Sequence, residues 1–270
     1  PVDGNFAMQP QALAAAIEAD IAAGRTPCCV IATLGTTGVG AIDPLGPIGE
    51  ICQRHGIFLH VDAAWAGSAL VLPEWRWMIE GIEAVDSLAF NPHKWLFTNF
   101  DCSAHFVRSP DDLVRTLDIS PAFLKTREGD QVIDYRNWSV PLGRRFRALK
   151  LWFVLRSYGV TEIRRRIAEH IELAREAAAW MEAAADFELL APLSLALFNF
   201  RYHPVGLDDP DALDRLNENL LHELNNSGAL YLTQNNVNGT YSIRFSVGQT
   251  YTERRHVVAA WQAIQDTARR

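Results

Sequence analysis

The sequence lacks the features that mark several whole classes of protein. Among its 270 residues, no apolar run approaches the ~18 residues of a membrane-spanning helix. Its 25 Lys and Arg residues are dispersed, so no basic block indicates a nucleic-acid partner. The N-terminus has no charged segment followed by an apolar one, and no signal peptide is predicted. No Met precedes Pro1, as expected of a processed chain, a fragment or one of two polypeptides.

Cysteine is also scarce, and no Cys-x-x-Cys pair occurs. The four cysteines are Cys28, Cys29, Cys52 and Cys102, of which two are adjacent and two lie alone in apolar surroundings. This usage predicts buried thiols in a reducing compartment, and therefore a cytoplasmic protein without disulfides. It predicts no metal site either.

What the first half does contain is an alternation of strand and helix patterns. Helices are predicted at 10–23 and 47–55, and short apolar strands at 28–32, 56–61, 86–90 and 103–107. Such alternation favours an α/β fold with a mainly parallel sheet. The polar residues that can do chemistry fall just beyond the strand ends, where ligands bind in open α/β sheets.

The second half has a different organisation. Proline, glycine and mixed charge over 115–138 predict a long mobile loop, which is often a functional lid. Two helices are expected at 144–158 and 161–185. A small α+β region then follows, with strands at 195–201, 229–233 and 241–246 and helices at 209–226 and 252–268. We therefore expect a large domain over residues 1–149 and a small C-terminal domain over 150–270.

Asp62 and Lys94 each follow a predicted strand. A lone aspartate there is usually a cap or turn residue, and a lone lysine is usually solvated. Their flanks set this pair apart, because Trp95-Leu96-Phe97 would supply apolar surroundings directly after the lysine.

These flanks belong to long, ordered motifs that span nearly the whole chain. The motifs are Leu34-Gly35-Thr36-Thr37, His60-Val61-Asp62-Ala63-Ala64-Trp65-Ala66-Gly67-Ser68, Asn91-Pro92-His93-Lys94-Trp95, Asn99-Phe100-Asp101-Cys102-Ser103-Ala104, Asp134-Tyr135-Arg136-Asn137-Trp138 and Pro141-Leu142-Gly143-Arg144-Arg145-Phe146-Arg147. The sequence resembles the aromatic-L-amino-acid decarboxylase family, the group II decarboxylases of fold type I that use pyridoxal 5'-phosphate (PLP). The resemblance implies a PLP-dependent carboxy-lyase that converts an aromatic L-amino acid to its amine and CO2.

The resemblance gives Lys94 and Asp62 the two central roles. Lys94 matches the lysine that holds PLP as a Schiff base, and Asp62 matches the partner of the pyridine nitrogen. A carboxylate there keeps the nitrogen protonated, which makes the ring an electron sink. The lysine must be partly desolvated so that its amine can be neutral and nucleophilic.

Further roles follow by matching position. Ala64 matches a small residue that packs on one face of the PLP ring, and Thr37 matches a PLP contact. Asn91 matches a residue near the phosphate and His93 lines the same pocket, although both could simply form a polar turn before a helix. In related glutamate-type decarboxylases, the arginine that matches Arg244 holds the substrate carboxylate. A structural ion pair is the alternative for this arginine.

The sequence departs from the family at its N-terminal side. Family members are longer there by roughly a domain, which carries a serine-alanine phosphate cradle and the histidine that stacks on PLP. We therefore expect either that another chain supplies these parts or that this chain alone is inactive. Family members are homodimers, so a homodimer is expected. A non-catalytic subunit derived from such an enzyme is a further alternative.

A second departure lies in the loop, where Phe123 stands in place of the family's usual tyrosine. A tyrosine hydroxyl can protonate the carbanion left by decarboxylation, which gives the amine. Phenylalanine has no such proton, and the carbanion could then react with oxygen. In this respect the sequence resembles aldehyde synthases of the family, which release an aldehyde, ammonia and hydrogen peroxide. The alternative is that another group or water supplies the proton and Phe123 merely closes the loop.

Overall fold

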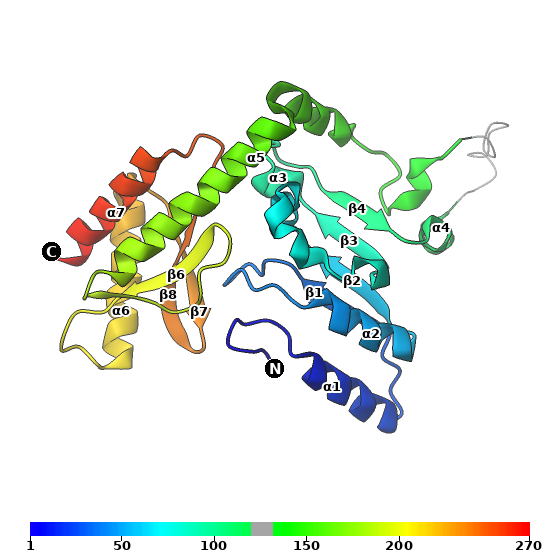
Figure 1. Cartoon of the computed structure of the whole chain (residues 1–270), viewed down its shortest axis with the longest axis horizontal. Helices are drawn as coiled ribbons and strands as arrows, with labels where there is room; N and C mark the ends of the chain where they lie inside the picture. The colour runs from blue at the N-terminus through cyan, green and yellow to red at the C-terminus, as the bar shows by residue number, and fades with distance from the viewer. Residues whose placement is uncertain (120–131) are drawn as a thin grey trace.

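The first half of the chain forms a four-stranded sheet (Figure 1). In the computed structural model, which describes residues 1–119 and 132–270, the strand order is β1-β2-β3-β4. The bounds are β1 Cys29–Thr33, β2 Phe58–Asp62, β3 Ser87–Phe90 and β4 Ala104–Val107. The first three strands are parallel, as predicted, and β4 is antiparallel to β3. The short helix α3 (Pro92–Trp95) is the only helix between β3 and β4, and a single turn does not make the long crossover that a parallel pair needs.

Helices cover one face of this sheet. The helices α1 (Pro10–Ala22) and α2 (Leu45–His55) agree with the prediction to within two residues, and α2 ends at Gly56 in the left-handed conformation. Leu59 and Val61 are fully buried on the face that α2 covers. On the other face, Ile31 and Phe58 are 59% and 47% exposed. Cys28 and Cys29 are exposed, so the expectation that all four thiols are buried was wrong for these two.

Three short 3-10 helices connect β2 to β3, and the sequence pattern did not indicate them. They are η1 Ala66–Val71, η2 Pro73–Ile79 and η3 Ile82–Ala84. Pro73 begins η2, and Gly81, at φ 89°, precedes η3. A Cβ on Gly81 would lie 2.4 Å from the Cα of Gly46. Position 81 therefore favours glycine for two reasons, the positive φ and the close approach of the Gly46 backbone.

Described elements occupy both ends of the loop that was predicted over 115–138. Helix α4 (Pro110–Leu117) extends into it, capped by Ser109, whose side chain accepts from the Asp112 amide. A 3-10 turn, η5 (Tyr135–Trp138), ends it, and here Asp134 accepts from the Arg136 amide. Residues 120–131, which contain Phe123, lie outside the described part of the chain.

Helix α5 (Arg147–Glu182) leads from the first sheet to the second (Figure 1). Gly159 has non-helical angles inside it, φ 68° and ψ 166°, and divides it into two helical segments. The prediction of two helices that meet near this glycine is therefore confirmed.

The second sheet is antiparallel, in the order β5-β6-β8-β7. Its strands and helices are β5 Phe187–Leu189, β6 Leu197–Tyr202, α6 Pro210–Asn226, β7 Thr233–Val237, β8 Thr240–Ser246 and α7 Arg254–Ala268. The strand predicted at 229–233 was wrong, since β7 begins only at Thr233. The side chain of Asn225 bonds both the amide and the carbonyl of Leu232, which keeps that segment out of the ladder. Asn238 and Gly239, both at positive φ, form the tight turn between β7 and β8.

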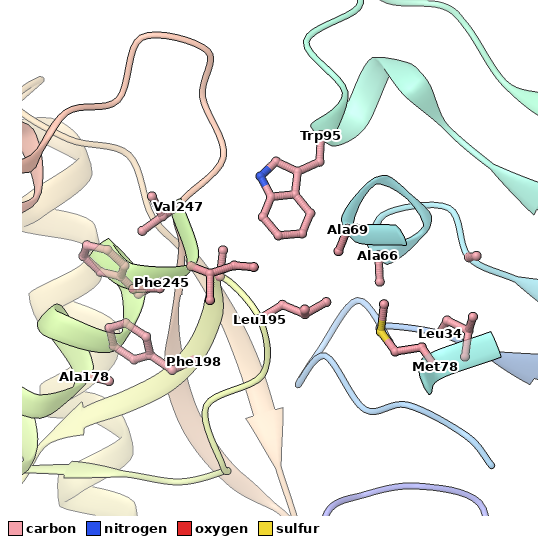
Figure 2. Packing of buried hydrophobic residues seen from close by; sticks show 14 of the residues in the cluster. Leu34, Ala66, Ala69, Met78, Trp95, Ala178, Leu195, Phe198, Phe245 and Val247 are labelled. Carbon is pink, nitrogen blue, oxygen red and sulfur yellow. The ribbon is translucent and has the colours of Figure 1, made fainter. Parts of the chain in front are cut away.

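A continuous hydrophobic core joins the two sheets. Figure 2 shows Leu195, which precedes β6, extending toward Ala66 of η1, with Trp95 nearby on the same side as η1. Trp95 is fully buried, stacks on Trp65 with ring centroids 4.8 Å apart, and donates from Nε1 to Nδ1 of His170 at 3.1 Å. The end of α3 is therefore fixed by packing on both sides.

Candidate active site

Three parallel strands bring their carboxyl ends to one edge of the first sheet. Asp62 is the last residue of β2, and α3, which carries Lys94, begins two residues after β3 ends. The segment that follows β1 includes Thr37. The amide of Asn91 donates to the carbonyl of Ala64 at 2.9 Å, which ties the turn before Lys94 to the segment after Asp62. Sequence analysis predicted this clustering at the strand ends.

A pocket of about 420 Å³ opens at this edge. It is lined by Gly35, Thr37, Trp65, Lys94, Arg244, Ser246, Gly248 and Gln249. Three residues predicted for the site, Lys94, Thr37 and Arg244, therefore meet in one pocket, although Arg244 comes from the second sheet. A Cβ on Gly35 would lie 2.6 Å from that of Ala66, so only glycine fits this wall.

Lys94 has no polar partner among residues 1–119 and 132–270, since its side chain makes neither a hydrogen bond nor an ion pair there. Trp95 and Leu96, which follow it, are buried as expected. Lys94 itself is exposed. Among the described residues, the apolar side chains that follow Lys94 are thus buried, but the lysine side chain itself stays accessible to solvent, so these residues do not desolvate its amine.

Asp62 is held by a local hydrogen bond. Its Oδ1 accepts from the Ala64 amide at 2.9 Å, and its side chain is exposed and forms no ion pair with any described residue. By strand alternation, Asp62 lies on the same sheet face as Phe58, opposite buried Val61. Asp62 and Ala64 adjoin the pocket through the chain but are not among its lining residues.

Asn91 and His93 also lie beside the pocket rather than in its lining. Asn91 precedes α3, and its side chain makes no capping hydrogen bond. His93 has Nδ1 2.6 Å from the carbonyl oxygen of Cys102, and its ring packs edge-on against Phe100 at 4.9 Å. In this chain His93 is therefore turned toward the Asn99–Cys102 segment.

Arg244 is half-buried in β8 and lines the pocket. Its Nε donates to the carbonyl oxygen of Thr37 at 2.7 Å, and burial lowers the pKa of its guanidinium. It makes no ion pair with any described residue, which removes the structural ion pair as an explanation within this part of the chain. A half-buried cation that lines a pocket without an anionic partner can receive an anionic ligand.

Sequence analysis missed several lining residues. Ser246 lies two residues after Arg244 on the same face of β8, and strand alternation could have identified it. Trp65 was part of a recognised motif but received no role. Gly248 and Gln249 follow β8 in irregular structure, where no periodic signal exists.

Comparison with known proteins identifies the family of this chain. The family model for the "Pyridoxal-dependent decarboxylase conserved domain" matches residues 1–203. A tryptophan decarboxylase of Camptotheca acuminata is 44% identical over 98% of this chain and 53% of its own length. A phenylacetaldehyde synthase of a Rosa hybrid cultivar is 42% identical over 98% of this chain and 54% of its own. The crystal structure of Oryza sativa TDC with PLP and tryptamine matches with a TM-score of 0.95 and 36% identity, over 98% of this chain and 55% of that one.

The fold is that of the fold type I PLP-dependent enzymes. The chain belongs to the pyridoxal-dependent decarboxylase family, whose cofactor is PLP. It spans about half the length of the curated relatives it matches.

The residues present fit this cofactor. PLP needs an amine to hold its aldehyde and a carboxylate for its ring nitrogen. The pocket presents the unpaired amine of Lys94, and Asp62 stands at the end of the strand beside it.

None of the helices in residues 1–119 and 132–270 has the length and apolar character that a membrane crossing requires.

Proposed function

We propose that this chain supplies the PLP-holding lysine and its partner carboxylate to an enzyme that decarboxylates an aromatic L-amino acid. One observation carries the proposal: Lys94, unpaired among the described residues, lines a pocket at the carboxyl edge of a parallel sheet. The identities to a tryptophan decarboxylase and to a tyrosine decarboxylase of Papaver somniferum, 44% and 42%, support an aromatic substrate.

Each predicted residue has a role in this proposal. When bound, PLP supplies an electron sink for the electron pair that the departing carboxylate leaves behind. Lys94 would hold the cofactor through Nζ, and Asp62 would keep a proton at the pyridine nitrogen. Thr37 would contact the cofactor and Ala64 would pack against its ring. Asn91 and His93 would lie toward its phosphate.

Arg244 would receive the substrate carboxylate. Its guanidinium lines the same pocket as Lys94 and has no ion-pair partner among the described residues. The hydrogen bond from Nε to the Thr37 carbonyl oxygen orients the Arg244 guanidinium before a ligand binds.

Phe123 favours an aldehyde as the alternative product. This residue lies outside the described part of the chain, and its phenyl side chain has no proton to donate. The 42% identity to a phenylacetaldehyde synthase supports oxidative deamination as the alternative outcome. That reaction would consume oxygen and water and release an aldehyde, CO2, ammonia and hydrogen peroxide.

The proposal also covers the domains, the subunits and the cellular location of the protein. We propose a PLP-binding domain over residues 1–149 and a small domain over 150–270, supported by the two separate sheets. The remainder of the site would come from the half of the relatives' length that these residues do not cover, on this polypeptide or another, within a homodimer. The free cysteines support a cytoplasmic location.

Product analysis tests the function. The protein is loaded with PLP and given L-tryptophan or L-tyrosine in air, and amine, aldehyde and hydrogen peroxide are measured. Amine without peroxide is expected of a decarboxylase, and aldehyde with equimolar peroxide is expected of a synthase. A protein that takes up no PLP and forms neither product would be a non-catalytic subunit, and the proposed function would be wrong.

A further inference from the structure

The turn that carries Thr37 into the pocket is held largely by side chains of the second sheet. We call residues Thr36–Gly40 the Thr37 turn. Within it, the Gly40 amide donates to the Thr36 carbonyl at 2.8 Å, and just after it the Ala41 amide donates to Oγ1 of Thr36 at 2.9 Å. The carbonyls of Thr37, Gly38 and Gly40 accept no bond from this local set.

These three carbonyls accept bonds from residues more than 150 positions later in the chain. Arg244 donates to Thr37, and Ser194 donates from Oγ to Gly40 at 2.6 Å. The Gly38 carbonyl accepts two bonds, from Nδ2 of Asn199 at 2.9 Å and from Nδ2 of Asn235 at 3.1 Å. Three of the carbonyls that the turn leaves open, those of Thr37, Gly38 and Gly40, are therefore bonded by the second sheet or by the segment just before it.

Asn199 is the centre of this arrangement. It is fully buried in β6 between Phe198 and Phe200, which are also fully buried. Its Oδ1 accepts from Nδ2 of Asn235 at 3.0 Å and from Oγ of Ser242 at 3.4 Å. An amide in such an apolar strand costs free energy unless all its polar atoms are bonded, and here the bond to Gly38 completes the set.

The turn is shaped for this contact. A Cβ on Gly38 would lie 3.2 Å from Nδ2 and 3.3 Å from Oδ1 of Asn235, so a side chain there would press on the donor. Glycine at this position lets the backbone approach the two amides closely.

We propose that Asn199 and Asn235 are positioning residues that fix the Thr37 turn through the Gly38 carbonyl, and so let the second sheet set the shape of the PLP pocket. The proposal rests on the proposed function, because Thr37 matters only if the pocket holds PLP. It adds two residues that do not line the pocket themselves.

The variants are Asn199→Leu, which keeps the side-chain size but removes the amide, and Asn235→Ala at a partly exposed position where folding is easier to retain. The matched control is Asn217→Leu. Asn217 is also fully buried and bonds the amide and carbonyl of Tyr202 and the carbonyl of Leu213, but it does not contact the Thr37 turn.

Two readouts separate the proposal from a general loss of stability. Hydrogen exchange of the peptide that covers residues 34–42 is measured without PLP, and the PLP dissociation constant is measured by absorbance titration. Loss of a bond to Gly38 should speed exchange in this peptide about tenfold and weaken PLP binding about fivefold in both variants. Asn217→Leu should change neither, although it destabilises the fold.

Exchange that is unchanged in the two variants, or raised equally in Asn217→Leu, would overturn the positioning role. Faster exchange with unaltered PLP affinity would overturn the link to the pocket. A wild-type protein that binds no PLP would instead overturn the proposed function, and exchange would still decide whether the asparagines hold the turn.

Discussion

Acid should destabilise this protein through His170. The imidazole is 2% exposed in α5, and its Nδ1 accepts a hydrogen bond from Nε1 of Trp95. Burial lowers its pKa from 6.5 to about 4. The folded state therefore holds His170 neutral, whereas the unfolded chain protonates it as the pH falls below about 6.5. The stabilisation is complete above that pH and is lost as the pH falls toward 4.

The size of the effect follows from the two pKa values. Their difference corresponds to a loss on the order of 3 kcal/mol in the low-pH limit, and to about 2 kcal/mol between about pH 7.5 and about pH 5. In His170→Asn, Oδ1 can still accept from Trp95, but the side chain does not titrate. The cavity that this substitution leaves lowers stability equally at both pH values, so it does not affect the comparison.

Urea unfolding of both proteins at the two pH values measures the difference. Groups that titrate in both proteins cancel, and the wild type should lose about 2 kcal/mol more than His170→Asn on acidification. An equal loss in the two proteins would show that the buried histidine does not oppose protonation, and the reasoning would fail.

Three further changes have definite expectations. Lys94→Ala should abolish the imine absorbance that PLP produces while leaving the urea midpoint within error, and a retained imine band would contradict the assignment. Gly81→Ala should cost about 2 kcal/mol or more, because the residue has φ 89° and its Cβ would meet Gly46; an unchanged urea midpoint would show that the crossing relaxes freely. Phe123→Tyr should shift products from aldehyde toward amine if the wild type releases aldehyde, and an unchanged ratio would remove Phe123 from the proton-transfer argument.

Much of the first sheet could be predicted because its strands are short apolar runs that end in polar residues. The runs before Asp62 and Asn91 placed both site residues at one sheet edge, and parallel pairing brings such ends together. The direction of β4 could not be predicted in the same way, because an apolar run specifies a strand but not its partner.

The hydrogen bonds between the two sheets could not be predicted from the sequence, for a different reason. Arg244 bonds the Thr37 carbonyl across 207 residues, and Asn199 bonds Gly38 across 161. A side chain that satisfies a distant backbone carbonyl leaves no periodic pattern in the sequence. The 3-10 turns between β2 and β3 escaped prediction because their apolar residues follow neither a helical nor a strand period.

The most direct test of the central claim is the identity of the residue that holds PLP. The sequence contains three lysines, Lys94, Lys125 and Lys150, and Lys150 lies 3.7 Å from a carboxylate oxygen of Asp101. The protein is incubated with PLP, reduced with borohydride and digested, and the modified peptide is identified by mass spectrometry, with Lys94→Arg as the control. We expect PLP on Lys94 and no label in the variant. Label on Lys125 or Lys150, or no label at all, would contradict it.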